Sequence, residues 1–148
     1  MKITDALAAE HTIFLGVFDQ IERVLPSFTT LVEVRNIANI VEGLLQRHAE
    51  AETNLAYLAL DHTLAHKDRL ERLHHDHHEL DGRLKKIHVA NTCAEARRLL
   101  KSALQYSRDH FHAEEHSLFP MLDKTLREET LVELGQAWQQ RIRQPGKR

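Results

Sequence analysis

Four histidines of this chain stand where helical spacing would turn them toward a common interior. They are His11, His48, His77 and His110. Two of them are followed by a carboxylate four residues later, as His48-x-x-x-Glu52 and His110-x-x-x-Glu114. Four residues is about 6 Å of rise on nearly the same face of a helix, so each pair can converge on one centre. Imidazoles that are neutral near pH 7, together with carboxylates, are typical metal ligands.

The elements that must position these residues are helices, because apolar residues recur at helical spacing along nearly the whole chain. Pro26 and Pro120 would end or kink two of the helices, and a linker is expected near residues 61–67. Four pairs of residues suggest where helices begin: Thr30 with Glu33, Asp68 with Glu71, Thr92 with Glu95, and Thr125 with Glu128.

Each of the four long helices carries one inward seam with steps of three or four residues. The seams are Leu7, His11, Phe14, Phe18, Ile21 and Leu25; then Val34, Ile37, Val41, Leu44, His48, Glu52 and Leu55; then Leu70, Leu73, His77, Leu80, Leu84 and Ile87; then Leu99, Ala103, Tyr106, His110, Glu114 and Ser117. The sequence therefore predicts an all-α protein, an up-and-down four-helix bundle with a short C-terminal helix. We expect a single domain over residues 1–148, with the bundle at about 5–122 and the C-terminal helix at about 125–143.

Four histidines crowd the stretch LHHDHHELDG at residues 73–82. Only His77 falls in the seam of its helix, and His75 and His78 are expected to point into solvent. His74 lies three residues before His77, on the flank of the seam, and could reach inward as a seventh ligand.

A purely structural polar core is the alternative to a metal site. A single inward histidine usually finds a hydrogen-bond partner in the core. Six unsatisfied polar groups would cost about 6–18 kcal/mol, as much as the whole stability of a typical domain, about 5–15 kcal/mol. We therefore expect a bound pair of metal ions. Nitrogen and carboxylate donors without thiolate suit iron, manganese or zinc.

The composition excludes several other classes of protein. The formal net charge is −2 with acids and bases interspersed, so neither nucleic acid nor an anionic membrane is an expected partner. No stretch approaches the roughly 20 apolar residues of a membrane span, and Asp5 and Glu10 stand where a secretory signal would be apolar. The single cysteine, Cys93, excludes a disulfide framework. A cytoplasmic protein is expected.

These motifs resemble those of the hemerythrin-like, HHE cation-binding domains, over about residues 5–122. The most specific part is HFHAEEHSLFP at 110–120. HAEAETNLAYL at 48–58 is similar to the family's second-helix motif, with Leu58 where a proline is common. DHHELD at 76–81 and EHTIF at 10–14 supply the remaining two histidines.

The resemblance implies a non-haem di-iron centre bridged by an oxo, hydroxo or water ligand, with manganese or zinc less expected. One iron would be held by His11 and His48, the other by His77 and His110, and the bridging carboxylates would be Glu52 and Glu114. Oxygen-carrying members of the family have a further histidine four residues before the position of His77. That position is Leu73 here, so His74 is the nearest candidate for a seventh ligand.

We expect from this a di-iron protein that binds or reacts with oxygen, peroxide or nitric oxide, for sensing, storage or scavenging. The alternatives are a di-iron enzyme with peroxidase-like, catalase-like or iron-centre repair activity, and a metal-sensing regulatory module. Tyr106 could line the site or be a core residue, and Glu115 could orient a ligand. The C-terminal helix, with Leu131, Leu134 and Trp138, could pack on its own bundle or form a dimer contact.

Overall fold

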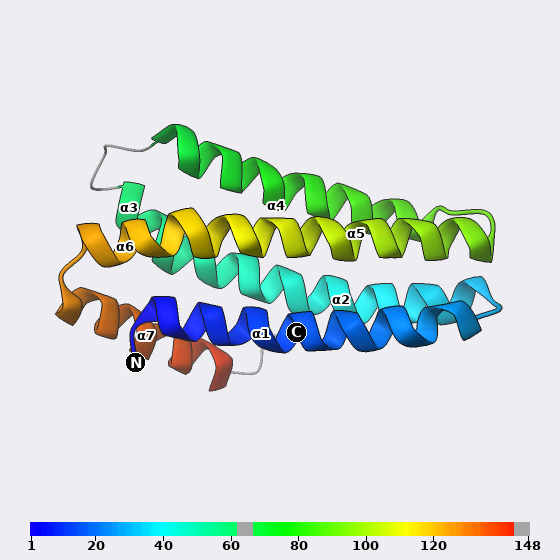
Figure 1. Cartoon of the computed structure of the whole chain (residues 1–148), viewed down its shortest axis with the longest axis horizontal. Coiled ribbons are helices and arrows are strands. Elements are labelled where there is room, and N and C mark those ends of the chain that lie inside the picture. Colours follow the sequence, from blue (N-terminus) through cyan, green and yellow to red (C-terminus); the bar gives the residue numbers. More distant parts are fainter. Residues whose placement is uncertain (62–66, 144–148) are drawn as a thin grey trace.

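Four long helices lie side by side along the long axis of this computed structural model, which describes residues 1–61 and 67–143 (Figure 1). They are α1 (Ile3–Val24), α2 (Leu31–Ala51), α4 (Lys67–His88) and α5 (Cys93–Ala113). Successive helices run in opposite directions, and there is no strand within the described ranges (Figure 1). The all-α four-helix bundle predicted from the seams is confirmed. None of the described helices is both long and apolar enough to span a bilayer.

Two of the long helices do not end where regular α-geometry ends. After α2 the chain makes a π-helical turn, η2 (Glu52–Tyr57), and then a short helix, α3 (Leu58–Asp61). After α5 it makes a second π-helical turn, η3 (Glu114–Leu118), and then α6 (Phe119–Thr125). Pro120 therefore sits in the first turn of α6, directly after the π-helical turn, and does not end the helix. Each π-helical turn begins at one of the two predicted bridging carboxylates.

The remaining elements are a single 3-10 turn, η1 (Leu25–Ser27), which contains Pro26 and follows α1, and the C-terminal helix α7 (Glu128–Arg143). Two of the expected helix starts are confirmed, because the hydroxyls of Thr30 and Thr92 accept backbone N–H groups three residues later. The Asp68 side chain and most of the expected linker lie outside the described residues. The predicted start at Thr125 is wrong: Thr125 is the last residue of α6, and the Leu126 N–H closes that helix on the Leu122 carbonyl.

Several seam residues were also misplaced by the sequence. Ile37, Leu99 and Tyr106 are only partly buried, whereas the residue after each of them is buried. Leu44 is 38 % exposed, whereas Leu45 is buried, because the inward face of α2 includes the small residue Ala38 and is rotated toward Leu45. Ser117 is only partly buried and donates its hydroxyl to the Ala113 carbonyl. The π-helical turn shifts the register by one residue, so that Leu118 takes the inward position.

The interior of the bundle has two apolar clusters with a polar layer between them. One cluster includes Phe14, Leu45, Leu80 and Phe111, and the other includes Leu7, Leu55, Leu73 and Leu118. Along each long helix, the inward histidine stands between a residue of one cluster and a residue of the other. The apolar clusters therefore seal the histidine layer on both sides along the bundle axis.

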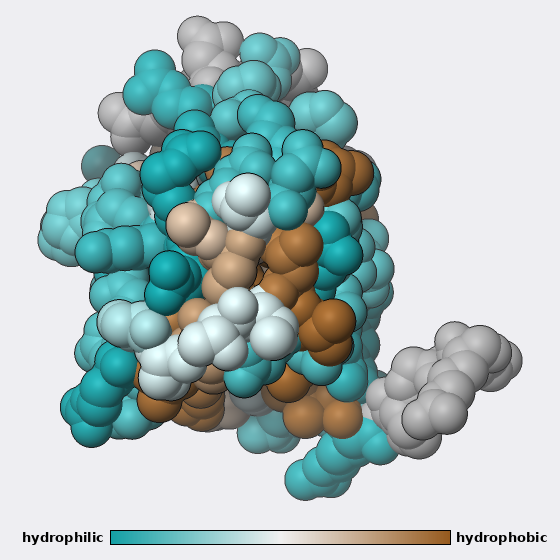
Figure 2. All heavy atoms as spheres, turned by 90° about the vertical axis from the view of Figure 1, so that its right-hand side faces the viewer, coloured by the Kyte–Doolittle hydropathy of each residue, from teal (hydrophilic) through white to brown (hydrophobic). Residues whose placement is uncertain are grey.

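The far end of the bundle, where α1 joins α2 and α4 joins α5, faces the viewer in Figure 2, and apolar side chains lie there between polar ones. Val24, Val32 and Val89 are exposed near these connections. Single exposed apolar residues of this kind are normal on a protein surface and need no partner to explain them.

Helix α7 turns back and packs beside the first part of α1, near the N-terminus (Figure 1). Leu131 is buried in the second apolar cluster, and Leu134 and Trp138 pack partly buried against it. Gly135 allows the close approach, because a Cβ atom at this position would lie 2.3 Å from the Met1 carbonyl oxygen. The C-terminal helix therefore packs on its own bundle.

Candidate metal centre

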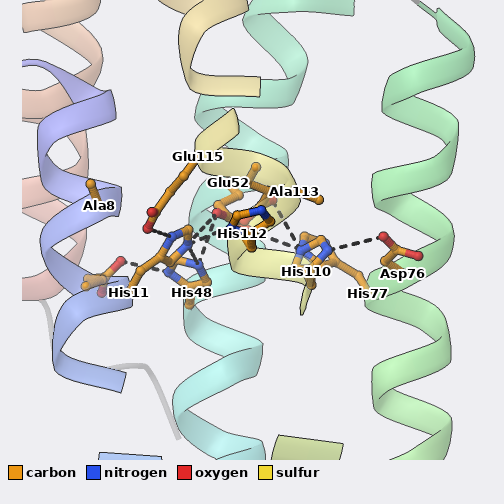
Figure 3. Close-up of polar contacts among 12 residues, drawn as sticks. Ala8, His11, His48, Glu52, Asp76, His77, His110, His112, Ala113 and Glu115 are labelled. Atoms are coloured by element: carbon orange, nitrogen blue, oxygen red, sulfur yellow. Dashed lines mark hydrogen bonds and ion pairs between the residues drawn. The ribbon is translucent and has the colours of Figure 1, made fainter. Parts of the chain in front are cut away.

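The polar layer brings together the six side chains that the seams and the resemblance singled out. One ligand atom from each of His11, His48, Glu52 and Glu114 lies within 4.8 Å of the others, and the same holds for Glu52, His77, His110 and Glu114. We call His11 and His48 the first histidine pair and His77 and His110 the second. Figure 3 shows the first pair on one side of Glu52 and the second pair on the other.

The first histidine pair is buried. The Nε2 atoms of His11 and His48 face each other at 3.0 Å. Nε2 of His48 lies 3.0 Å from Oε1 of Glu52, and Nε2 of His11 lies 3.6 Å from the same oxygen and 3.4 Å from Oε2 of Glu114. All four side chains are buried. Two imidazole nitrogens and two carboxylate oxygens thus point at one small volume.

The second histidine pair meets the opposite oxygens of the same two carboxylates. Nε2 of His77 lies 3.2 Å from Oε2 of Glu52, and Nε2 of His110 lies 3.2 Å from Oε1 of Glu114. Each carboxylate therefore presents one oxygen to the first pair and the other oxygen to the second. This is how a carboxylate that bridges two cations is oriented. The His77 side chain is 14 % exposed, the most open of the six.

The unpaired atoms of this cluster fit bound cations. Among the described residues, both oxygens of Glu52, Oε2 of Glu114 and Nε2 of His110 are buried without a hydrogen-bond partner. Imidazole nitrogens approach some of these atoms, but with geometry unsuited to hydrogen bonds. A buried polar group without a partner costs roughly 1–3 kcal/mol. Cations would satisfy all four atoms, and the nitrogen and carboxylate donors suit iron, manganese or zinc.

A family model described as the hemerythrin HHE cation binding domain matches residues 2–122 of the chain. The chain belongs to this family. Searches among curated proteins and among solved structures found no match. Membership in a cation-binding family and the His/Glu cluster agree with each other, and the family resemblance stated from the motifs is confirmed.

Carboxylates around the first histidine pair change its protonation. Burial opposes a charge on His11, but the contacts with Glu114 and Glu52 outweigh it and raise the pKa of His11 to about 9. Burial likewise opposes a charge on His48, but the charge of Glu52 and the contact with Glu10 raise its pKa to about 10. In return, although burial acts in the opposite direction, the charge of His48 and its neighbours lowers the pKa of Glu52. Without metal, the first pair therefore holds a proton at neutral pH.

Three of the four histidines contact a second carboxylate through Nδ1, an arrangement that is common for histidines that bind metals. Nδ1 of His11 lies 2.9 Å from Glu115, as the motif suggested. Nδ1 of His48 lies 3.0 Å from Glu10, and Nδ1 of His110 lies 3.4 Å from Asp76 (Figure 3). Sequence reasoning missed Glu10 and Asp76. Their positions gave a hint, because each directly precedes a seam histidine of its own helix. The histidine that each contacts, however, lies on another helix and could not be read from the spacing.

Tyr57 is a further buried side chain of the cluster that the sequence did not reveal. Its hydroxyl donates to Oε1 of Glu114 at 2.5 Å and lies 3.4 Å from Nε2 of His77. Five residues rotate an α-helix by about 140° past a full turn, so α-helical spacing would place Tyr57 away from Glu52. The π-helical turn η2 pairs positions five residues apart and brings both to the same side. Burial and the charges of Glu52 and Glu114 raise the pKa of Tyr57, so its hydroxyl keeps its proton.

The other histidines of the crowded stretch lie outside the cluster. His75 and His78 are exposed, as predicted. His74 is partly buried, with its ring edge-on to Tyr57 at 4.9 Å between centroids, and it is absent from both ligand groups found in the described residues. Tyr106 does not reach the cluster: its hydroxyl donates to Oδ1 of Asp76 at 3.0 Å.

A groove of about 490 Å³ between α2 and α4 leads from the surface to the cluster. Its inner wall is formed by His48, His77, His110 and Phe111, and its outer wall includes Glu42, Glu50, His74 and His78. A small solute in this groove reaches His48 and both histidines of the second pair, of which His77 is the most exposed.

Proposed function

We propose that this protein holds a non-haem di-iron centre that binds or reacts with oxygen, peroxide or nitric oxide. The observation that carries the proposal is the orientation of Glu52 and Glu114. Each turns one oxygen to the first histidine pair and the other to the second. That orientation suits two cations side by side better than one cation or a purely structural polar core. Iron is favoured over manganese and zinc by the family motif rather than by the donor set.

The number of protein donors favours a reactive centre over a structural one. Each cation would have two imidazoles and a share of two carboxylates, which leaves positions free if iron prefers about six ligands. Iron with free positions can bind a small ligand and exchange electrons with it. The groove lined by His77 and His110 gives such a ligand a route to the second histidine pair.

Side chains around the cluster determine how much water and which proton donors a bound ligand would meet. Phe111 stacks on His11 with 4.1 Å between ring centroids, and apolar residues of both clusters exclude water from the buried side. The Tyr57 hydroxyl oxygen lies 2.5 Å from Oε1 of Glu114 and donates its proton to it. Bound cations would offset the charges of Glu52 and Glu114 that raise the pKa of Tyr57, and the hydroxyl could then give its proton to a ligand that gains negative charge as it is reduced.

Tyr57 also supports a second candidate function, a peroxide-consuming enzyme. Breaking the bond between two peroxide oxygens requires protons as well as electrons, and a buried phenol beside the cluster can supply the former. A carrier or sensor that only binds its ligand does not need such a donor. Turnover of peroxide, measured as repeated cycles per protein, separates the two candidates.

Metal analysis tests the proposal most directly. Protein produced with iron in the medium is expected to contain two iron ions per chain. When it is reduced without air and then exposed to oxygen, its absorbance should change. Zinc or manganese at full occupancy with no response to oxygen would contradict the di-iron proposal. If the protein takes up no metal, the cluster is instead a purely structural polar core.

A further inference from the structure

A tryptophan of the C-terminal helix contacts a carboxylate that orients one histidine of the cluster. Nε1–H of Trp138 donates to Oε2 of Glu10 at 3.1 Å, and the same oxygen lies 3.0 Å from Nδ1 of His48. Trp138 lies on α7, Glu10 on α1 and His48 on α2. Three separate helices thus form one chain of polar contacts that ends on a histidine of the first pair.

This contact is held in place by the way α7 is seated. Gly135, less than one turn before Trp138, lies against the backbone of Met1, Lys2 and Ile3. At the other end of the helix, the Arg141 guanidinium donates to the Glu50 carbonyl of α2. The position of the indole N–H is therefore fixed relative to both α1 and α2.

Without the indole, Glu10 would lose one of its two contacts at Oε2 and keep the one with Nδ1 of His48. Its side chain is 21 % exposed, so the carboxylate can turn toward water. Once Glu10 turns away, Nδ1 of His48 loses its acceptor, and the ring is free to change its orientation and its tautomer. Partners of this kind keep the other ring nitrogen aimed at a metal.

The second histidine pair has a counterpart of the same construction. The Tyr106 hydroxyl donates to Oδ1 of Asp76 at 3.0 Å, and Oδ2 of Asp76 lies 3.4 Å from Nδ1 of His110. In each pair, one histidine therefore contacts a carboxylate that also accepts from an aromatic donor. His11, the other histidine of the first pair, contacts Glu115 instead. Trp138 differs in that it belongs to a helix outside the four-helix bundle.

We infer that Trp138 is a positioning residue of the metal centre: through Glu10 it fixes His48, so that docking of α7 tunes cation binding by the first histidine pair. Tyr106 serves the second pair through Asp76. This inference rests on the proposed metal centre. It assigns α7 a role beyond burying apolar surface, and it predicts that changes in α7 alter one half of the centre more than the other.

The test compares Trp138→Phe with Tyr106→Phe, two substitutions that keep an aromatic ring and remove one donor. Metal-free protein is titrated with Zn²⁺ and followed by calorimetry, because zinc adds no redox chemistry. Loss of a partner that orients a ligand typically weakens metal binding about 10–100-fold. Trp138 is one contact further out, so we expect a loss of about 3–10-fold in one of the two binding steps.

The emission of Trp138 identifies the step, because it is the only tryptophan of the chain. In the parent protein the emission should change as the first histidine pair takes up Zn²⁺. In Tyr106→Phe the emission should follow zinc as in the parent, while calorimetry shows the other step weakened. In Glu10→Gln, the emission of the metal-free protein should already be shifted and its response to zinc should be smaller. Glu22→Gln is the matched control, because Glu22 lies on the same helix as Glu10 and contacts Arg108, which lies outside the cluster.

The outcomes separate this inference from the proposed function. A parent protein that binds two zinc ions, with Trp138→Phe matching it within twofold in both steps, would overturn the inference and leave the metal centre intact. A parent protein that binds no zinc would overturn both. If Trp138→Phe fails to fold, as judged by circular dichroism, Glu10→Gln decides: parent-like binding contradicts the inference, and weakening of the step reported by Trp138 supports it.

Discussion

The Nε2 atoms of His11 and His48 face each other at 3.0 Å in a fully buried layer. One proton can lie between two such nitrogens, and two protons cannot. A cation placed among the nitrogens and the oxygens of Glu52 and Glu114 replaces that proton. Proton loss and metal uptake are therefore linked at this pair.

Metal uptake should release at least one proton per protein at pH 7.5. The pKa of His11 is raised to about 9 and that of His48 to about 10, so the metal-free pair is protonated at this pH, whereas metal-bound imidazoles are not. Calorimetry in buffers with different ionisation enthalpies counts the protons. The release from this pair should diminish as the pH rises through 9 to 10, where the metal-free pair has already lost its proton. Metal uptake without proton release at pH 7.5 would mean that the metal-free first histidine pair is not protonated.

Substitutions in the crowded histidine stretch should separate ligands from surface residues. His77→Ala is expected to lose about half of the bound metal or more, because it removes a ligand at the second histidine pair. His75→Ala and His78→Ala are the matched controls and should keep the full metal content, since both side chains are exposed. Metal analysis of the purified variants measures this. Equal metal content in all three would refute the assignment of His77.

Tyr57→Phe should leave the metal content unchanged and slow the reaction with peroxide. Phenylalanine keeps the ring that stacks on His77 with 5.5 Å between centroids, and it removes only the hydroxyl beside Glu114. Loss of a positioned proton donor typically costs about 10²–10⁴-fold, and we expect a decrease of at least tenfold. Stopped-flow absorbance of the reduced protein mixed with peroxide gives the rate. An unchanged rate in Tyr57→Phe would mean that this side chain serves only in packing.

Gly135→Ala should destabilise the protein by loosening the seat of α7. The added Cβ would lie 2.3 Å from the Met1 carbonyl oxygen, so the backbone of α1 or α7 has to shift, at a cost of about 1–3 kcal/mol. Gly16→Ala is the control: it lies in the middle of α1 with open space around it, and alanine there should be neutral or stabilising by about 0.5–1 kcal/mol. Urea unfolding of the metal-free proteins compares the two. Equal stability of Gly135→Ala and the parent would contradict the tight approach of the helices.

Seam spacing found the six side chains that the structure brings together, because in a bundle the inward direction of a helix can be read from its apolar residues. The same reasoning failed wherever a helix departs from regular α-geometry. Tyr57 and Leu118 reach their positions through π-helical turns, which leave no mark in an apolar pattern. Glu10 and Asp76 lie off the seams of their own helices. Their partners on other helices become visible only once the helices are placed.

The role of His74 decides how the centre should react with oxygen. Its ring packs against Tyr57 and lines the groove, and it belongs to neither ligand group. In the proposed di-iron centre, six protein ligands would leave neither iron saturated, so an external ligand could reach positions that a reversible oxygen carrier keeps closed. We therefore expect the reduced protein to be oxidised by air within minutes, without reversible oxygen binding, and the oxidised protein to bind azide.

Stopped-flow absorbance of the reduced protein mixed with oxygen, repeated for His74→Ala, tests this expectation. Both proteins should be oxidised in the same way, because removing a side chain that is not a ligand leaves the number of free positions unchanged. The metal content of His74→Ala should equal that of the parent, in contrast to His77→Ala. If the parent instead binds oxygen reversibly and His74→Ala does not, then His74 must turn inward from its contact with Tyr57 when metal is bound. It would then be the seventh ligand that closes one of the two irons.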